Sequence, residues 1–251
     1  MAAGDSIIPL ITNGRNVKQR VYIGNNGYYR DEWEINPYNI VLYGIKDELR
    51  EHDHYTSMRM VKSILNNYGI NSVELKLGEF SAVEYKQDLM QKRIVTNHGH
   101  GTTVFNNNVP VSSGVTLNDR IVFLNNYTDV NTFFSNNWSG ITTSCEYIET
   151  NDDFSNIDLV LFLSCNTSYN DINDLPHKIV SHGAKTAIGF SDSIDCEQAN
   201  YWLISFYSSM ALGKTVSEAE ALAFSSLNPM YAATSGLDSI VIVGDNQYKL
   251  P

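Results

Sequence analysis

The chain has 251 residues, a hydrophobic fraction of 43% and a formal net charge of −11 at pH 7. This composition is that of a globular protein, and the acidic surface argues against nucleic acid or an anionic membrane as a direct partner, because both are bound through Lys and Arg. No apolar run approaches the length of a membrane-spanning helix, and no basic residue precedes the short apolar run near the N-terminus, so neither a membrane span nor a secretory signal is expected.

The first part of the chain predicts an extension followed by the start of a sheet. Residues 1–38 look irregular or weakly strand-like, and we expect an N-terminal extension or arm there, ahead of a single domain over 39–251. Residues 39–45 form an apolar run of strand type, and a helical pattern over about 53–68 follows. Residues 71–77 and 92–97 predict two further strands, the second of which ends in the sequence HGHG at 98–101.

The middle of the chain, 102–156, is polar and rich in Asn, Ser and Thr, with short apolar pieces at 121–124 and 132–134 that suggest strands or turns. The strongest predicted strand follows at 157–163. Its continuous apolar run is typical of a central parallel strand that is covered on both faces. This strand ends at Ser164 and Cys165.

The last third of the chain alternates helices and strands with clear end signals. We expect a helix over 174–182 with Asp174 as its cap, a strand over 184–190, a helix with an apolar face from Ala199 to Met210, a helix over about 216–224 and a strand over 239–243. The alternation predicts an α/β fold with a mostly parallel central sheet and helices packed on it.

Two of these strand ends carry residues that suit catalysis. Functional groups gather beyond the carboxyl ends of strands in open parallel sheets, and here one end presents His98 and His100 and another presents Cys165. A thiolate is the nucleophilic form of cysteine, and an imidazole is able to take its proton and later protonate a departing amine. The backbone N–H of Gly99, together with that of Cys165, would stabilise an oxyanion.

Other readings of these residues stay open. A cysteine at the end of a buried strand is often a small core residue. The HGHG run also fits a flexible turn or half of a metal site. His52 and His54 form another His-x-His pair, but the sequence gives no reason to bring it near, and we expect no metal and no cofactor. The three cysteines, Cys145, Cys165 and Cys196, form no CxxC pair, which favours free thiols in a reducing, cytoplasmic compartment.

Five segments in order resemble clan CD cysteine peptidases of the CHAT branch. IVTNHGHG (94–101) with VPVSSGVTL (109–117) resembles the histidine block, and DLVLFLSCNTS (158–168) resembles the nucleophile block. HGAKTAIGFSDSID (182–195) and FYSSMALGKTVSEAEALA (206–223) resemble the segments that follow, and IVIVGDNQYKL (240–250) is similar to the closing strand of gingipain-like peptidases. The resemblance covers residues 90–250 well and 39–90 only in outline.

The resemblance implies a caspase-like αβα sandwich and a cysteine endopeptidase with a His/Cys dyad and no obligatory cofactor. It makes Cys165 the nucleophile. Alignment on Thr-His-Gly makes His98 the catalytic histidine, which we prefer at this stage, and alignment on Gly-His-Gly makes it His100. Members of this branch often serve regulated proteolysis, including bacterial defence and self-processing. The partners implied are a protein or peptide substrate and a regulatory protein, and residues 102–156 are a candidate processing or lid region.

Substrate choice and two other classes of function remain open in the sequence. In this clan the loop after strand 184–190 lies near the S1 pocket, so Asp192 and Asp195, with Glu197, would pair with a basic P1 side chain. The alternative is that Asp195 caps the next helix and Asp192 is solvated. The other functions are a catalytically silent recognition module on a caspase-like scaffold and a nucleotide-binding doubly wound domain.

Overall fold

The computed structural model of the chain describes residues 7–12, 15–23, 28–35, 39–45, 54–78, 80–106, 109–118, 121–126, 144–169 and 173–250. The first three of these ranges are the strands β1 (Ile7–Thr12), β2 (Arg15–Ile23) and β3 (Tyr28–Ile35). They form an antiparallel three-stranded sheet of their own. Of the two expectations for residues 1–38, irregular or weakly strand-like, the described residues follow the strand-like one.

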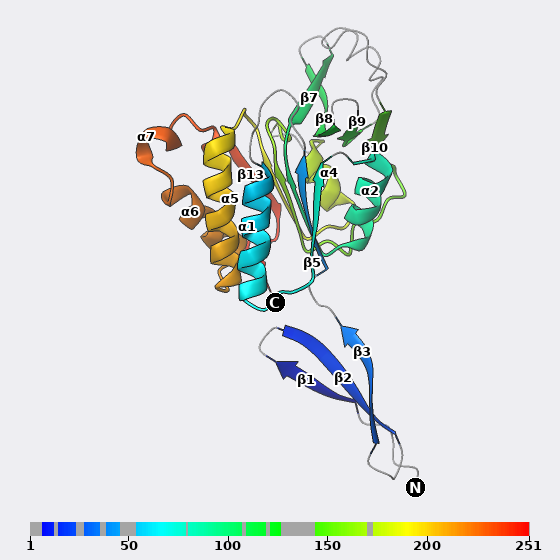
Figure 1. The fold of residues 1–251 in the computed structure, drawn as a ribbon. Helices are drawn as coiled ribbons and strands as arrows, with labels where there is room; N and C mark the ends of the chain where they lie inside the picture. The colour runs from blue at the N-terminus through cyan, green and yellow to red at the C-terminus, as the bar shows by residue number, and fades with distance from the viewer. Residues whose placement is uncertain are drawn as a thin grey trace.

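The main sheet has six strands in the order β13-β12-β11-β6-β4-β5 (Figure 1). Its strands are β4 (Ile40–Ile45), β5 (Val73–Gly78), β6 (Ile94–His98), β11 (Leu159–Leu163), β12 (Thr186–Phe190) and β13 (Ile240–Gly244). All pairs are parallel except β12 with β13, which is antiparallel. The expectation of an α/β fold with a mostly parallel sheet is confirmed.

Helices cover both faces of this sheet (Figure 1). The helices α1 (His54–Asn67), α5 (Cys196–Ala211) and α6 (Val216–Ser225) pack on one face, where they share a core with alternate residues of the strands. The helices α2 (Ala82–Gln91) and α4 (Leu175–Ser181) pack on the other face and share a second core with the intervening strand residues. A short helix, α7 (Pro229–Ala232), and a 3-10 turn, η1 (Leu237–Ser239), precede β13.

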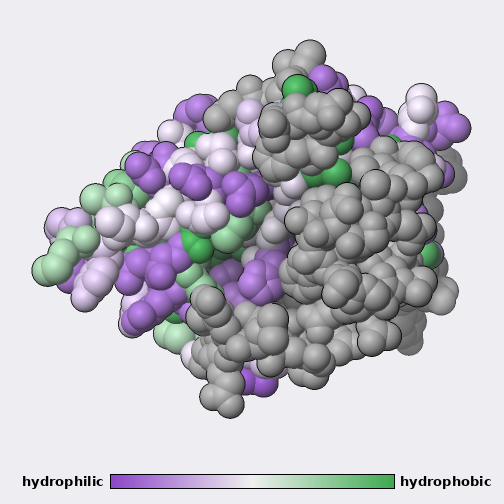
Figure 2. Space-filling view, turned by 90° about the horizontal axis from the view of Figure 1, so that it is seen from above, coloured by the Kyte–Doolittle hydropathy of each residue, from purple (hydrophilic) through white to green (hydrophobic). Residues whose placement is uncertain are grey.

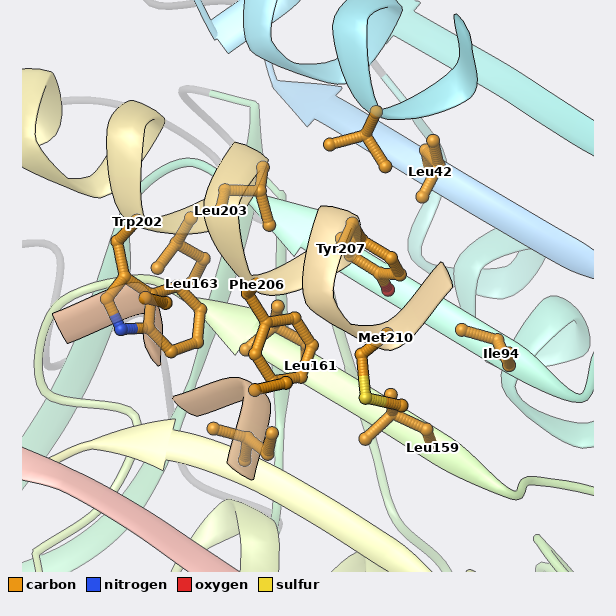
Figure 3. Close-up of a cluster of buried hydrophobic side chains, with 14 of the residues drawn as sticks. Leu42, Ile94, Leu159, Leu161, Leu163, Trp202, Leu203, Phe206, Tyr207 and Met210 are labelled. Carbon is orange, nitrogen blue, oxygen red and sulfur yellow. The ribbon is translucent and has the colours of Figure 1, made fainter. Parts of the chain in front are cut away.

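The strand β11 lies at the centre of the molecule because its side chains alternate between these two cores. Leu159, Leu161 and Leu163 face α5, and Val160 and Phe162 face α2 and α4. Figure 3 shows the first core, in which α5 presents a continuous apolar stripe to β11; its labelled members are Trp202, Leu203, Phe206, Tyr207 and Met210. Burial on both faces explains why this strand reads as an unbroken apolar run in the sequence.

The helix ends follow the sequence signals closely. Asp174 caps α4 and accepts a hydrogen bond from the backbone N–H of His177, and Thr215 and Glu218 form the capping box of α6. The helix α2 lies within a segment where the sequence analysis expected no helix. Its N-terminus is nevertheless marked by Ser81, whose side chain accepts a hydrogen bond from the N–H of Glu84.

A second, smaller sheet lies between β6 and β11 in the chain. Its strands are β7 (Gly101–Asn106), β8 (Val109–Asn118), β9 (Ile121–Leu124) and β10 (Ser144–Tyr147), in the order β10-β9-β8-β7. The expected strand at 121–124 is β9, and the expected piece at 132–134 lies outside the described residues. Within the polar region 102–156, most of the described residues up to Tyr147 belong to this sheet, whose strands lie together at the top of Figure 1.

Candidate functional site

The fold brings together the two strand ends that the sequence singled out. The strands β6 and β11 are parallel neighbours in the main sheet, and their register pairs His98 with Leu163. The ladder continues past the last pair, since the N–H of Gly99 donates to the carbonyl of Leu163 at 3.4 Å. Direct pairing of β6 with β11 therefore brings together two strand ends whose residues His98 and Cys165 are 67 residues apart in the sequence.

Gly101 shows how tightly the two chains approach beyond the strand ends. A Cβ atom on this glycine would lie 1.9 Å from the carbonyl oxygen of Cys165, so any side chain at residue 101 would collide with backbone. The chain that leaves β6 therefore stays in backbone contact with the chain that leaves β11. His100 directly precedes Gly101, and its carbonyl oxygen accepts a hydrogen bond from the N–H of Thr116 at 2.9 Å.

The two candidate histidines lie in different surroundings. His98 is the last residue of β6 and its side chain is 2% exposed. Its ring packs against that of His54 with the ring centroids 4.2 Å apart, and its Nδ1 lies 3.4 Å from Ser57 Oγ. His100 is exposed. The structure therefore buries the histidine that the sequence favoured and leaves the alternative at the surface.

Cys165 sits on a sharp turn at the end of β11. The next residue, Asn166, has a φ of 52°, a left-handed conformation that asparagine adopts more readily than most residues. The thiol of Cys165 is half-buried. Its Sγ accepts a hydrogen bond from the N–H of Ile194 at 3.3 Å and lies 3.7 Å from the carbonyl oxygen of the same residue.

These surroundings raise the pKa of the Cys165 thiol above its ordinary value. Burial is the main cause, because it disfavours the charged thiolate, and the carboxylate of Asp192 adds repulsion. The hydrogen bond from Ile194 acts in the opposite direction but does not compensate. A nucleophilic role for Cys165 at neutral pH therefore requires a base that takes its proton.

We expect Asp192→Asn to speed the alkylation of Cys165 by iodoacetamide. Removal of the negative charge lowers the pKa of the thiol, so below that pKa the rate rises by about two- to fivefold, and above it the rates of the two proteins converge. Peptide mass spectrometry across a pH series measures the rate at Cys165 separately from the other two cysteines. Asp153→Asn is the matched control, since Asp153 is an exposed aspartate that precedes β11 at its opposite end. Equal effects of Asp192→Asn and Asp153→Asn on the alkylation rate of Cys165 would contradict the assignment of this repulsion to Asp192.

The backbone N–H of Gly99 has an acceptor in this structure. It donates to the carbonyl of Leu163. The oxyanion role expected for Gly99 would require this hydrogen bond to open. The bond is long at 3.4 Å, and it is the last one of the β6–β11 ladder.

The acidic residues of the loop after β12 have separate roles in the structure. Asp195 caps α5, because its side chain accepts a hydrogen bond from the N–H of Gln198 at 2.9 Å. Asp195 also lines a pocket of about 250 Å³. The complete lining is Asp195, Glu197, Gln198, Tyr231, Thr234 and Ser235. Asp192 is exposed and uses its Oδ1 to accept a hydrogen bond from the N–H of Ser193 at 2.7 Å.

Ile194 connects the pocket to Cys165. Ile194, whose backbone contacts the Cys165 thiol, directly precedes the pocket residue Asp195. A volume of this size is small for a drug-sized ligand and suits a single side chain. Glu197 is exposed at this pocket.

His98 belongs to a second group of titratable residues, together with His54 and Cys196. The ligand atoms of His54, His98 and Cys196 lie within 4.8 Å of one another. Cys196 Sγ is 3.5 Å from Nδ1 of His54 and 3.9 Å from its Nε2. His54 and His98 are buried, with 4% and 2% of their surfaces exposed, and Cys196 is partly exposed.

The sequence analysis missed this group, although the sequence contains a signal for it. The buried face of α1 comprises His54, Ser57, Met58, Val61 and Leu65, so His54 stands where the apolar stripe of the helix predicts a buried residue. Cys196 precedes Ala199 by three residues and so extends the apolar stripe of α5 in the same way. Polar residues at the ends of two apolar stripes indicate a shared buried site. His52 lies outside the described residues.

No protein-family model matches the chain, and no curated protein matches it. In the part of the chain that the structure describes, no helix combines the length and the apolar character needed to cross a membrane. Seen from above the view of Figure 1, the described surface is mainly hydrophilic with scattered hydrophobic residues (Figure 2).

Proposed function

We propose that this protein is a cysteine endopeptidase with a caspase-like fold, in which Cys165 is the nucleophile and His100 is the general base. The observation that carries the proposal is the adjacency of the two strand ends. The strands β6 and β11 pair in parallel at the centre of the sheet, and the chains that leave them stay in contact at Gly101 and Cys165. The three-layer arrangement of helices around a mostly parallel sheet agrees with the αβα sandwich that the motif resemblance implies.

The placement of the histidines favours His100 over His98 as the base. His100 is exposed, and it directly precedes Gly101, which lies against the backbone of Cys165. His98 is buried and already contacts Ser57 and His54. A general base must reach both the thiol and the incoming substrate, which an exposed side chain beside the nucleophile does more readily than a buried one.

The proposed reaction uses these two side chains in sequence. His100 takes the proton of the Cys165 thiol, and the thiolate sulfur forms a bond to the carbonyl carbon of the substrate peptide. The imidazolium of His100 then gives its proton to the departing amine as the C–N bond breaks. A water molecule, deprotonated by His100, hydrolyses the resulting thioester and regenerates the thiol.

The acidic pocket beside Ile194 supports a preference for a basic P1 residue. Glu197 and Asp195 contribute carboxylates to a pocket that accommodates one side chain. An Arg or Lys side chain in this pocket would form charge-assisted hydrogen bonds, and the planar guanidinium of Arg would do so with two bonds at once. Asp195 already caps α5, so Glu197 is the main candidate.

One observation favours a second function, a catalytically silent recognition module on the same scaffold. The thiol of Cys165 contacts both backbone groups of Ile194, and its pKa is raised rather than lowered. A protein of this kind would keep the fold and the pocket and would bind a basic peptide without cleaving it.

Cleavage of a combinatorial peptide library by the full chain tests the proposal. We expect cleavage after Arg or Lys, and we expect Glu197→Gln to lower kcat/KM for basic P1 residues by about ten- to a hundredfold, because a charged hydrogen-bond partner is lost. Asp153→Asn is the control for a change of charge alone. A folded protein that binds basic peptides and cleaves no member of the library would contradict the peptidase and support the silent module.

A further inference from the structure

We propose that His54, His98 and Cys196 form a binding site for a zinc ion, with two imidazole ligands and one thiolate. The site is distinct from the proposed nucleophile, Cys165, and its existence does not depend on peptidase activity. It gathers residues from three elements: the start of α1, the end of β6 and the start of α5. We refer to these three residues as the His₂Cys cluster.

The distances within the His₂Cys cluster suit a tetrahedral ion. Zn–S and Zn–N bonds of about 2.3 and 2.0 Å at tetrahedral angles give an S···N separation of about 3.5 Å. Cys196 Sγ and His54 Nδ1 are 3.5 Å apart, which is this separation. All three ligand atoms lie within 4.8 Å of one another, so small side-chain rotations bring the third ligand into place.

Ser57 provides the orientation that metal-binding histidines require. Its hydroxyl donates a hydrogen bond to the carbonyl oxygen of His54 at 3.0 Å, so its single proton is already in use. The same oxygen lies 3.4 Å from His98 Nδ1 and is left to accept a hydrogen bond from it. His98 thereby holds its proton on Nδ1 and keeps the lone pair of Nε2 for a metal, as in sites where an outer partner fixes the tautomer.

The position of Cys196 favours its thiolate form. It is the first residue of the 16-residue helix α5, where the helix dipole stabilises negative charge. The thiolate is the form that binds a metal. Cys196 is also the partly exposed member of the cluster, so an ion has a route to ligands that are otherwise buried.

The chemistry of the donors selects the metal. Imidazole and thiolate are preferred by Zn²⁺ and by neighbouring transition metals such as Co²⁺, whereas Mg²⁺ and Ca²⁺ prefer oxygen ligands. Three protein ligands leave the fourth tetrahedral position for water or another small ligand. A bound ion would link α1, β6 and α5 directly.

Cobalt binding tests the His₂Cys cluster, because Co²⁺ replaces Zn²⁺ and gives a thiolate-to-metal charge-transfer band. The chain has three cysteines, so the variant Cys145→Ser/Cys165→Ser retains Cys196 as its single thiol. We expect one Co²⁺ per chain, with the band present in this variant and displaced by one equivalent of Zn²⁺. Addition of Cys196→Ser should abolish the band, and Ser57→Ala should weaken Zn²⁺ binding by about 10- to 100-fold.

Circular dichroism shows which variants remain folded. A folded double variant without the charge-transfer band would overturn the proposal, as would a Cys196→Ser single variant that binds Zn²⁺ with unchanged affinity. X-ray absorption of the Zn²⁺-loaded wild-type chain identifies the ligands of the ion even if the variants fail to fold. One sulfur and two imidazole ligands are the expected result, and an all-oxygen shell or a second sulfur would contradict it.

Discussion

Cys165→Ala is expected to abolish peptide cleavage, with a loss of about 10⁴- to 10⁶-fold in kcat, as is typical when a covalent nucleophile is removed. The physical reason is that no other atom at the end of β11 is able to form the thioester. Cys165 is half-buried rather than fully packed, so its replacement by alanine leaves the sheet intact and the expected change in stability is small. Cleavage rates of the best library peptide, measured beside thermal melts of both proteins, give the comparison.

The parallel variant for this experiment is Cys196→Ser. Cys196 Sγ lies 3.5 Å from an imidazole nitrogen of His54, so these two side chains form a thiol–imidazole pair in the described structure. If Cys165 is the nucleophile, Cys196→Ser retains most of the cleavage activity that the folded protein shows. Loss of activity in Cys196→Ser together with full activity in Cys165→Ala would transfer the catalytic role to the pair His54–Cys196.

His100→Ala is expected to lower kcat by about 10²- to 10⁴-fold, the usual contribution of a positioned general base. Without the imidazole, the raised pKa of Cys165 leaves little thiolate at neutral pH. The residual activity of the variant should therefore rise with pH as the thiol ionises by itself. The wild-type protein should instead show a plateau in kcat/KM that begins at lower pH.

His98→Ala distinguishes the two candidate histidines. This variant removes a buried side chain, so we expect lower thermal stability and loss of metal binding by the His₂Cys cluster. Its pH profile should keep the form of the wild-type profile, because His100 remains. A pH profile that changes in His98→Ala and not in His100→Ala would restore His98 as the base.

The sequence predicted the main sheet well because its central strands β6, β11 and β12 are buried on both faces. The apolar run that contains β11 is recognisable from the sequence alone. The caps at Asp174, Thr215 and Glu218 likewise mark the starts of α4 and α6 by local residues. The helix α2 was not expected, since its apolar stripe is weak and only the cap at Ser81 marks its start. In the smaller sheet the apolar run of β9 was expected, whereas β7, β8 and β10 gave a poor signal because polar residues and glycines interrupt them.

The candidate site was predictable only in part. The sequence predicts where β6 and β11 end. It does not show that these two strands pair with each other, which is what brings their ends together. The choice between His98 and His100 depends on where β6 ends. The strand continues through His98, so that side chain faces the α1–α5 core rather than the surface. The approach of His54 and Cys196 to His98 depends on how α1 and α5 pack on the sheet, which the apolar stripes of the two helices do not show by themselves.

Covalent labelling by a peptidyl acyloxymethyl ketone with a basic P1 residue is the most direct test of the central claim. This class of electrophile reacts with a cysteine only when the thiol attacks from a site that holds the peptide. Mass spectrometry of the labelled wild-type chain identifies the modified residue. We predict a single adduct on Cys165 that is lost in His100→Ala at neutral pH. An adduct on Cys145 or Cys196, or a folded chain that forms none, would contradict the proposed function.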